Sequence, residues 1–324
     1  MTPATAVITG VGLAVPGLDG AEDLLRPPSE GGGFDPATGL KGREMRHKDR
    51  ASRLALRSVE PALRDAGLLA DDSVYDGPAP STAVLVSTNL GNLDSVCDFA
   101  DTIAEHTVTG LSPLGLPHTS SNVIAGWVAI RYGMRGPNIT VCNGGTSGTD
   151  ALYWARNLIA VRRVDVVVVI GVEPDTEPAA RLLADGSDRP MLDGAAALVV
   201  ESAEHAGARG ARPRAVLTEV VRESGLSAAV DVALKAHAGP VGLWLTAQGT
   251  SVPALAGAAD IGAVPTVDLA ARLGHCSGAL GVLQCAAGVA YLAGGGAGSV
   301  LSTSSGPDDD AATALLLTAT GEAS

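Results

Sequence analysis

Short apolar runs alternate with amphipathic segments along this 324-residue chain. The run VDVVVVIG at 164–171 is almost entirely apolar, which is typical of a strand covered on both faces of a sheet. Residues 49–67 instead carry apolar side chains at helical spacing, with Leu56, Val59 and Leu63 on one face. The pattern therefore predicts an α/β fold in which buried strands alternate with helices.

The same patterns predict the order of the elements. Strands are predicted at 6–15, 81–88, 138–143, 164–171, 195–201, 214–221, 241–247, 300–302 and 314–318. Helices are predicted at 49–67, 92–106, 125–132, 146–162, 227–237 and 279–293. A stretch rich in Gly, Ala and Arg near 206–213 separates the two series. We therefore expect two halves of similar order, residues 1–205 and 206–324.

Composition and charge narrow the set of partners. The net charge is −13 and lysine is nearly absent, which argues against nucleic acid and anionic membranes as partners. No apolar run is long and uninterrupted enough for a membrane span. The four cysteines show neither a CxxC motif nor metal-ligand spacing, so we expect a reducing, cytoplasmic environment with no metal and no cofactor. The stretch MTPATAVITG lacks a basic region before its apolar residues, so no signal peptide is expected.

One stretch, VCNGGTSGTDAL at 141–152, has the pattern of a strand end, a tight turn and a helix start. Such a turn often presents a nucleophile at a helix N-terminus, where backbone N–H groups favour an anion. Here the tip is Asn143-Gly144-Gly145, which carries no nucleophilic side chain. Either Cys142 serves as the nucleophile, or the turn was built for chemistry that this chain does not perform.

Seven motifs, in order along nearly the whole chain, resemble those of the β-ketoacyl synthases. They are AVITGVG at 6–12, SP-x-x-x-P at 112–117, N-x-x-AG at 122–126, YGMRGPNITV at 132–141, VVVVIGVEP at 166–174, AQGTSVP at 247–253 and GHCSGALG at 274–281. The resemblance implies a thiolase-like five-layer αβαβα fold. It also implies condensing chemistry, in which a cysteine thiolate takes an acyl chain from a carrier protein while two histidines and a lysine assist.

Most catalytic positions that this resemblance implies are substituted. The cysteine position holds Gly145, which cannot form an acyl-enzyme. The first histidine position holds Gln248, which cannot exchange a proton near neutral pH, and the lysine position holds Ala270. The second histidine remains as His275. The Phe-Gly-rich loop that supplies part of the family's oxyanion hole is replaced by STSSGPDDD at 302–310.

Together these losses resemble the noncatalytic partners of ketosynthases in type II polyketide systems, called chain length factors or ketosynthase β subunits. The resemblance implies a heterodimer with a catalytic ketosynthase, indirect contact with an acyl carrier protein, and a role in shaping the acyl tunnel. Many such partners carry glutamine at the cysteine position, whereas this chain carries Gly145. The loops at 174–192 and 221–241 are shorter than in full-length ketosynthases, which favours a reducing, polyene-type system.

The same resemblance implies three sets of contact residues. The strand at the dimer interface comprises Asn138, Ile139, Thr140, Val141 and Cys142. The residues that limit chain length by their volume at the partner's tunnel are Leu90, Leu93, Val96, Phe99, Leu114 and Leu116. The cations that would dock an acidic carrier protein, in the basic run at 42–53, are Arg43, Arg46 and Lys48. Ordinary interface packing and a solvated helix start are the alternative interpretations of these sets.

An active enzyme is the rival hypothesis. In that case Cys142 or His275 would serve an acyltransferase or condensing reaction in this chain itself. We interpret Cys142 as a buried structural cysteine, because it lies in a strand three residues before the expected site. His275 is interpreted as structural, and Cys276 as pointing the opposite way from it. A degenerate homodimer with a binding role is a third possibility.

Overall fold

The computed structural model describes residues 3–26, 34–40, 42–45, 48–183, 190–237, 239–249, 261, 263–306 and 309–321. The strands are β1 (Ala6–Ala14), β2 (Thr82–Ser87), β3 (Asn138–Val141), β4 (Val166–Glu173), β5 (Gly194–Ser202), β6 (Ala215–Glu223), β7 (Val241–Leu245), β8 (Thr266–Val267), β9 (Ser299–Ser304) and β10 (Ala312–Thr318). The α-helices are α1 (Arg50–Asp65), α2 (Leu93–His106), α3 (Val123–Tyr132), α4 (Ser147–Ala160), α5 (Glu177–Leu182), α6 (Ala203–Ala208), α7 (Leu226–Lys235), α9 (Ala270–Leu273) and α10 (Leu280–Ala293).

Every strand and helix predicted from the sequence is present, with bounds that differ by a few residues. The elements that the sequence did not predict are short: α5, α6, α9 and β8 have six, six, four and two residues. Segments of this length hold too few residues to display a hydrophobic period, which explains why they were missed.

The strands form one mixed sheet in the order β3-β2-β4-β5-β1-β6-β10-β9-β7-β8. The first five strands take the order 3-2-4-5-1 from one edge inward, and β6 to β10 take the same order from the opposite edge inward, as β8-β7-β9-β10-β6. The two series meet at an antiparallel pair, in which Val7 of β1 lies opposite Val216 of β6. The boundary that we expect after residue 205 falls within α6 and stays a prediction.

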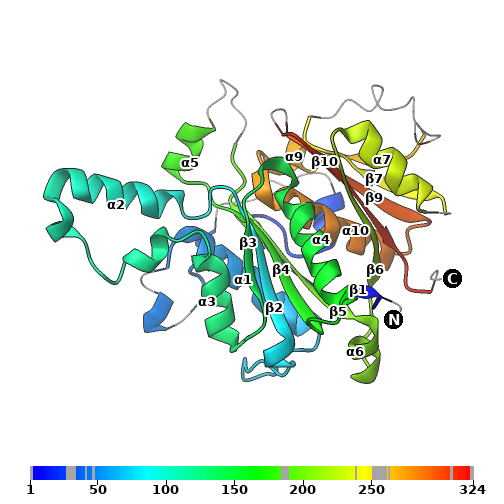
Figure 1. The fold of residues 1–324 in the computed structure, drawn as a ribbon, viewed down its shortest axis with the longest axis horizontal. Helices are drawn as coiled ribbons and strands as arrows, with labels where there is room; N and C mark the ends of the chain where they lie inside the picture. The colour runs from blue at the N-terminus through cyan, green and yellow to red at the C-terminus, as the bar shows by residue number, and fades with distance from the viewer. Residues whose placement is uncertain are drawn as a thin grey trace.

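The two halves of this sheet form two layers, and the helices form three more, one between the halves and one on each outer face (Figure 1). Helices α1 and α3 pack against the outer face of β2, β4 and β5, whereas α4 and α10 lie between the two series of strands. Helix α7 covers the outer face of β7, β9 and β10. Alternate β4 residues serve two layers, because Val167 and Val169 face the central core while Val166 and Val168 face α1 and α3. This is the α/β, thiolase-like five-layer arrangement that the motifs imply.

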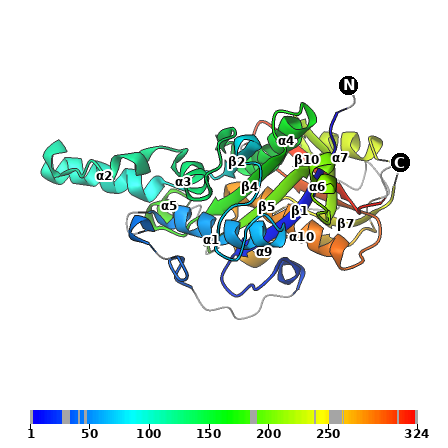
Figure 2. The ribbon, with the colours of Figure 1, turned by 90° about the horizontal axis from the view of Figure 1, so that it is seen from below.

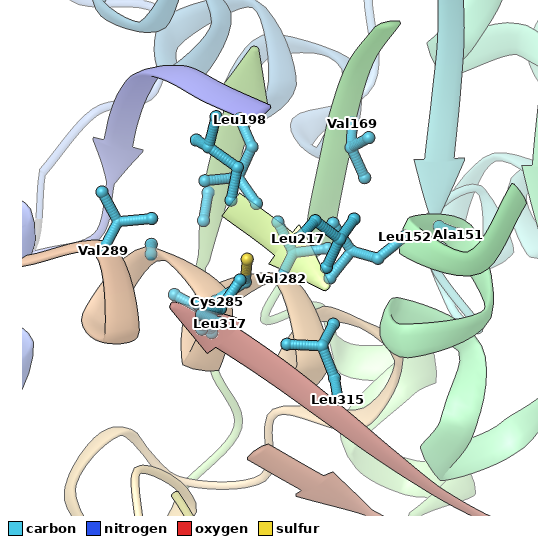
Figure 3. Packing of buried hydrophobic residues seen from close by; sticks show 14 of the residues in the cluster. Ala151, Leu152, Val169, Leu198, Leu217, Val282, Cys285, Val289, Leu315 and Leu317 are labelled. Carbon is cyan, nitrogen blue, oxygen red and sulfur yellow. The ribbon is translucent and has the colours of Figure 1, made fainter. Parts of the chain in front are cut away.

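The central core is built from aliphatic side chains of both series (Figure 3). Leu152 from α4 and Val282 from α10 are buried among strand residues such as Leu198, Leu217 and Leu315. Aromatic residues make up only 3% of the sequence, so small and branched aliphatic side chains supply this packing. The two central helices hold the turn that precedes α4 against the segment that precedes α10, which positions the site described below.

Helix α2 projects from the body of the molecule in both views (Figures 1 and 2). None of its fourteen residues, all of which are described, is buried. The segment that follows it carries Leu114 and Leu116, which are 71% and 61% exposed. In the part of the chain that the structure describes, no helix combines the length and the apolarity needed to cross a bilayer.

Candidate functional site

A cleft of about 860 Å³ opens where the turn after β3 meets the loops that follow β2, β7, β9 and α9. The described residues that line it are Asn89, Leu90, Cys142, Gly144, Gly145, Leu183, Gln248, Gly249, His275, Ser277, Leu280, Ser305, Gly306 and Asp309. The structure thus brings Gly145, Gln248 and His275 to one cleft. Ala270, at the expected lysine position, is instead buried in the core.

The turn at the head of α4 is held by a side chain from the other side of the cleft. The Asn89 Nδ2 group donates to the Gly144 carbonyl and to Ser277 Oγ, both at 2.9 Å. The Ser147 hydroxyl donates to Asn89 Oδ1 at 3.0 Å. Gly144 adopts a φ of +67°, a left-handed conformation that favours glycine. Asn89 therefore fixes the turn relative to the segment before α10.

The apex of the turn has no room for a side chain in this conformation. A Cβ atom added to Gly145 would lie 2.8 Å from Gly306 N and 3.0 Å from Asp309 Oδ2. The space that a cysteine would occupy is therefore taken by the loop after β9. That loop is the one in which STSSGPDDD replaces the family's Phe-Gly motif, and it does reach the cleft.

His275 lies half-buried in the cleft wall, on the segment between α9 and α10. Its backbone N–H donates to the Pro190 carbonyl at 2.8 Å, and its carbonyl accepts from Leu192 N–H at 3.1 Å. Cys276 points away from the cleft into the core, which confirms the opposite orientation predicted for the pair. The backbone around His275 is thus fixed by a bridge to residues 190–192.

The prediction that Cys142 is a buried structural cysteine is wrong. Its side chain is exposed and lines the cleft, because β3 ends at Val141 and Cys142 follows at the rim. Partial desolvation by the surrounding atoms raises the pKa of the Cys142 thiol, and the negative charge of Glu173 adds to this effect. A raised pKa lowers the thiolate fraction at neutral pH, and the thiolate is the nucleophilic form.

Comparisons with known proteins identify relatives of this chain in sequence and in fold. A family model described as "Beta-ketoacyl synthase, N-terminal domain" matches residues 29–188. A solved structure described as "The ishigamide ketosynthase/chain length factor" matches with a TM-score of 0.80 and 25% sequence identity, over 98% of this chain and 100% of that one. The chain belongs to the β-ketoacyl synthase family.

A curated relative of this β-ketoacyl synthase homologue is the "3-oxoacyl-[acyl-carrier-protein] synthase 2" of Rhizobium meliloti (strain 1021). It is 30% identical over 207 residues, which cover 56% of this chain and 48% of the relative. The chain thus spans about half the length of the curated relatives it matches. A structure described as "AntDE:AntF (apo): type II PKS acyl-carrier protein in complex with its ketosynthase bound to the hexaketide" has a TM-score of 0.78 at 16% identity, over 98% of this chain and 99% of that one, and shares the fold.

Glu173, which the sequence analysis did not single out, lies directly beneath the cleft of this β-ketoacyl synthase homologue. Its side chain is fully buried, and its carboxylate accepts from the backbone N–H groups of Asn89 (2.7 Å), Leu90 (3.1 Å) and Gly278 (3.0 Å). The Thr88 hydroxyl donates to it at 3.2 Å. Burial raises the pKa of Glu173 to about 7, although these four donors act in the opposite direction. Glu173 therefore joins the loop after β2 to the segment before α10.

Glu173→Gln is expected to remove a pH dependence from the stability of the fold. Folding raises the pKa of this carboxyl from 4.5 to about 7, so the folded protein holds the proton more tightly than the unfolded chain. Stability from this group is therefore lost as pH rises from 4.5 to 7, by an amount on the order of 3 kcal/mol. Denaturant unfolding at several pH values measures this loss, and equal pH profiles for the variant and the wild type would refute it.

The six expected tunnel residues do not share one location. Leu90 is buried. Of the six, it alone is among the described residues that line the cleft. Leu93, Val96 and Phe99 lie on α2, and Leu114 and Leu116 follow it; the exposed ones are Val96, Leu114 and Leu116. These five therefore belong to the projecting arm rather than to the cleft of this chain.

The three cations expected to dock a carrier protein also differ in their exposure. Arg43 is exposed, and Arg46 lies outside the described residues. Lys48 is buried, with its ammonium 3.3 Å from the centroid of the Trp127 ring, so it does not present a surface charge in this chain as the docking prediction requires. The cation–π contact and the covering atoms explain why the basic run is not one continuous surface.

Strand β3 forms an edge of the sheet. Within the described residues it pairs with β2 alone, in parallel, with Val86 opposite Thr140. Beside it, Tyr153 and Trp154 of α4 are exposed, and a hollow of about 550 Å³ runs along the strand past Asp150 and Arg222. An edge strand flanked by exposed aromatic side chains is typical of a surface that pairs with another chain.

In the described part of the chain, His, Cys, Asp and Glu side chains form no group of three or more that could hold a metal ion. The polar and titratable side chains that line this cleft include His275, Gln248, Cys142 and Asp309.

Proposed function

We propose that this chain is a noncatalytic subunit of the chain-length-factor type. It pairs with an active ketosynthase and forms a heterodimeric β-ketoacyl-[acyl carrier protein] synthase of type II polyketide biosynthesis. The observation that carries the proposal is the apex at Gly145, where no nucleophile is present and where the loop after β9 leaves no space for one.

The remaining polar groups of the cleft do not replace the missing cysteine. Gln248 can donate and accept hydrogen bonds but cannot exchange a proton near neutral pH. Cys142 has a raised pKa, which disfavours its thiolate. His275 is retained, but the position from which the resemblance implies lysine support holds the buried Ala270. A complete condensing site is therefore expected in the partner subunit.

Two surfaces support pairing. The first surface is the free edge of β3 together with the exposed aromatic residues of α4. The second surface consists of the apolar side chains of the α2 arm, none of which is buried on α2. A second chain would remove both from water. One of the similar solved structures is described as a ketosynthase/chain length factor, and another contains a type II acyl-carrier protein with its ketosynthase. The carrier protein is proposed to dock on the partner, since Lys48 is buried here.

The α2 arm is proposed to reach the partner's acyl tunnel. Phe99 packs near Gly115, so that a Cβ added to this glycine would lie 2.9 Å from the Phe99 ring, and the two segments of the arm brace each other. Side chains from a braced arm could bound a tunnel by volume, because protein interiors resist even one extra methylene. The short loops at 174–192 and 221–241 favour a reducing, polyene-type system for this assembly.

Replacing Val96, Phe99 or Leu114 by alanine in the assembled synthase is expected to lengthen the product by at least one extension unit in at least one variant. A smaller side chain deepens the tunnel, whereas Val96→Phe or Leu114→Trp should shorten it. Mass spectrometry of the products measures the change. Exposed Val74, which lies away from the arm, provides the control substitution Val74→Ala. Unchanged product length in every arm variant would exclude gating by this arm.

A second candidate function is an acyltransferase or condensing reaction within this chain. One observation favours it, namely that Cys142 and His275 line the same cleft. It requires a thiolate at Cys142, which the raised pKa of this thiol opposes.

Co-expression with a ketosynthase that has an intact cysteine tests the proposed function. We expect the tagged chain to retain the ketosynthase in a one-to-one complex through affinity and size-exclusion chromatography, and we expect condensation only when both subunits are present. A chain that forms only homodimers in the presence of each candidate ketosynthase would instead support the degenerate homodimer.

A further inference from the structure

Two backbone N–H groups from distant parts of the chain converge on one carboxylate at the apex of the cleft. Gly145 N–H donates to Asp309 Oδ2 at 3.0 Å, and Gly306 N–H donates to the same oxygen at 2.7 Å. Gly145 precedes α4, whereas Gly306 and Asp309 lie on the loop between β9 and β10. The contact between Gly145 and Asp309 therefore closes this loop onto the turn.

The carboxylate fits closely against glycines. A Cβ added to Gly144 would lie 2.2 Å from Asp309 Oδ1, and a Cβ added to Gly145 would lie 3.0 Å from Asp309 Oδ2. A side chain at Gly144 would therefore displace Asp309, whereas one at Gly145 would be in tight contact with it. The Asp309 carboxylate can occupy this position because residues 144 and 145 carry no side chains.

The negative charge of Asp309 is favoured by its position beside the N-terminus of α4. It lies at the start of α4, a fourteen-residue helix whose N-terminal N–H groups favour an anion. The neighbouring Asp310 is 96% exposed, and its carboxylate is 3.5 Å from Arg222. Arg222 also binds Asp150 in α4 at 2.9 Å, so the guanidinium links the loop to the same helix. Arg222 thus lies between Asp150 of α4 and the exposed Asp310 of the loop.

We propose that Asp309 is an internal anion that closes this N–H site. By accepting from Gly145 and Gly306, it denies both donors to an external carboxylate or thioester carbonyl, the ligand class that such a pair of N–H groups would otherwise bind. The cleft is closed at its apex by this carboxylate as well as by the loss of a nucleophile. This inference concerns the cleft of this chain alone and does not depend on the partner.

Alkylation of a thiol placed at the apex tests the closure. Gly145→Cys needs no unusual φ, since the positive φ belongs to Gly144, but its Cβ would lie 2.8 Å from Gly306 N, so the backbone at 305–306 must shift slightly to admit it. A carboxylate this close raises the pKa of the new thiol by about one unit or more. With Cys142→Ala in every protein, the added change Asp309→Ala is expected to speed alkylation by iodoacetamide at pH 7 at least about tenfold.

The matched control is Asp310→Ala in the same background. It removes a carboxylate from the same loop that touches neither N–H donor, so its alkylation rate is expected to equal that of Gly145→Cys. Equal rates with and without Asp309 would overturn the proposal, as would an acceleration by Asp310→Ala as large as that by Asp309→Ala.

Anion binding provides a test without the cysteine substitution, which covers the case in which Gly145→Cys fails to fold. In Asp309→Ala the two N–H groups are open, and malonate is expected to raise the thermal unfolding midpoint beyond the effect of chloride at equal ionic strength. The apparent affinity for malonate should exceed that of the wild type at least about tenfold. The proposal fails if wild type and Asp310→Ala respond as Asp309→Ala does, or if Asp309→Ala shows no added stabilisation.

Discussion

Gly148→Ala is expected to destabilise the fold by about 2 kcal/mol or more, because overpacking at this site presses backbone against backbone. Gly148 lies in the first turn of α4, where this helix crosses the start of α10. A Cβ at this position would lie 2.7 Å from Gly281 N and 2.9 Å from Gly281 Cα. No flexible side chain is available to move aside, so the two central helices must separate.

Denaturant unfolding of the isolated chain measures this loss. Gly126→Ala is the matched control, because Gly126 also lies in the first turns of a helix, α3, and a Cβ there would meet nothing within 4 Å. Alanine has the higher helix propensity, so the control should gain up to about 1 kcal/mol. If both variants shift stability in the same direction by similar amounts, the crossing of α4 and α10 is not as close as described.

Thr140→Pro is expected to weaken pairing with the ketosynthase at least about a hundredfold, which corresponds to about 3 kcal/mol. Val84 N–H donates to the Pro137 carbonyl and Thr88 N–H to the Val141 carbonyl. Both backbone groups of a residue in a parallel strand point to the same side, so alternate residues face β2 and Thr140 faces the free edge. Proline at this position removes the outward N–H and leaves the ladder to β2 intact.

Thr140→Val is the control for that variant, since it keeps the backbone N–H and changes only the side chain. Both proteins should unfold at nearly the wild-type temperature as isolated chains, and only the proline variant should fail to co-purify with the partner. Retention of the partner by Thr140→Pro at wild-type yield would show that the edge of β3 is not used for pairing.

The fold could be predicted from the sequence because its signals are local. The apolar residues of 164–171 required cover on both faces, and β4 is indeed shared between two layers. The helical spacing of Leu56, Val59 and Leu63 placed one face of α1 in the core. Short elements such as β8 carry no such signal, because two residues define no period.

The candidate site could be predicted only in part. The local motifs identified Gly145, Gln248 and His275, which meet in one cleft. The carboxylate of Asp309 on the Gly145 N–H could not be predicted, because the contact joins positions 164 residues apart and depends on the path of a loop. Glu173 was quoted within a motif, yet its role follows from three backbone donors that no side-chain pattern reveals.

Two site predictions were wrong for physical reasons. Cys142 was assigned to the interior because it was expected to lie within the strand at 138–143, but β3 ends at Val141 and Cys142 follows at the cleft. Lys48 was assigned to a basic surface, but a nearby Trp127 ring holds its ammonium beneath other atoms. In both cases the exposure of the side chain depends on tertiary contacts, which the neighbouring sequence does not reveal.

The proposed noncatalytic role of this chain is tested most directly by treating it, alone and paired with an intact ketosynthase, with malonyl and acyl thioesters. Mass spectrometry of each subunit then shows where acyl groups are attached. We expect no covalent adduct on this chain in either case, Cys142 included, and acylation of the partner's cysteine in the pair. An acyl adduct on Cys142 of the isolated chain, or condensation by that chain alone, would contradict the account.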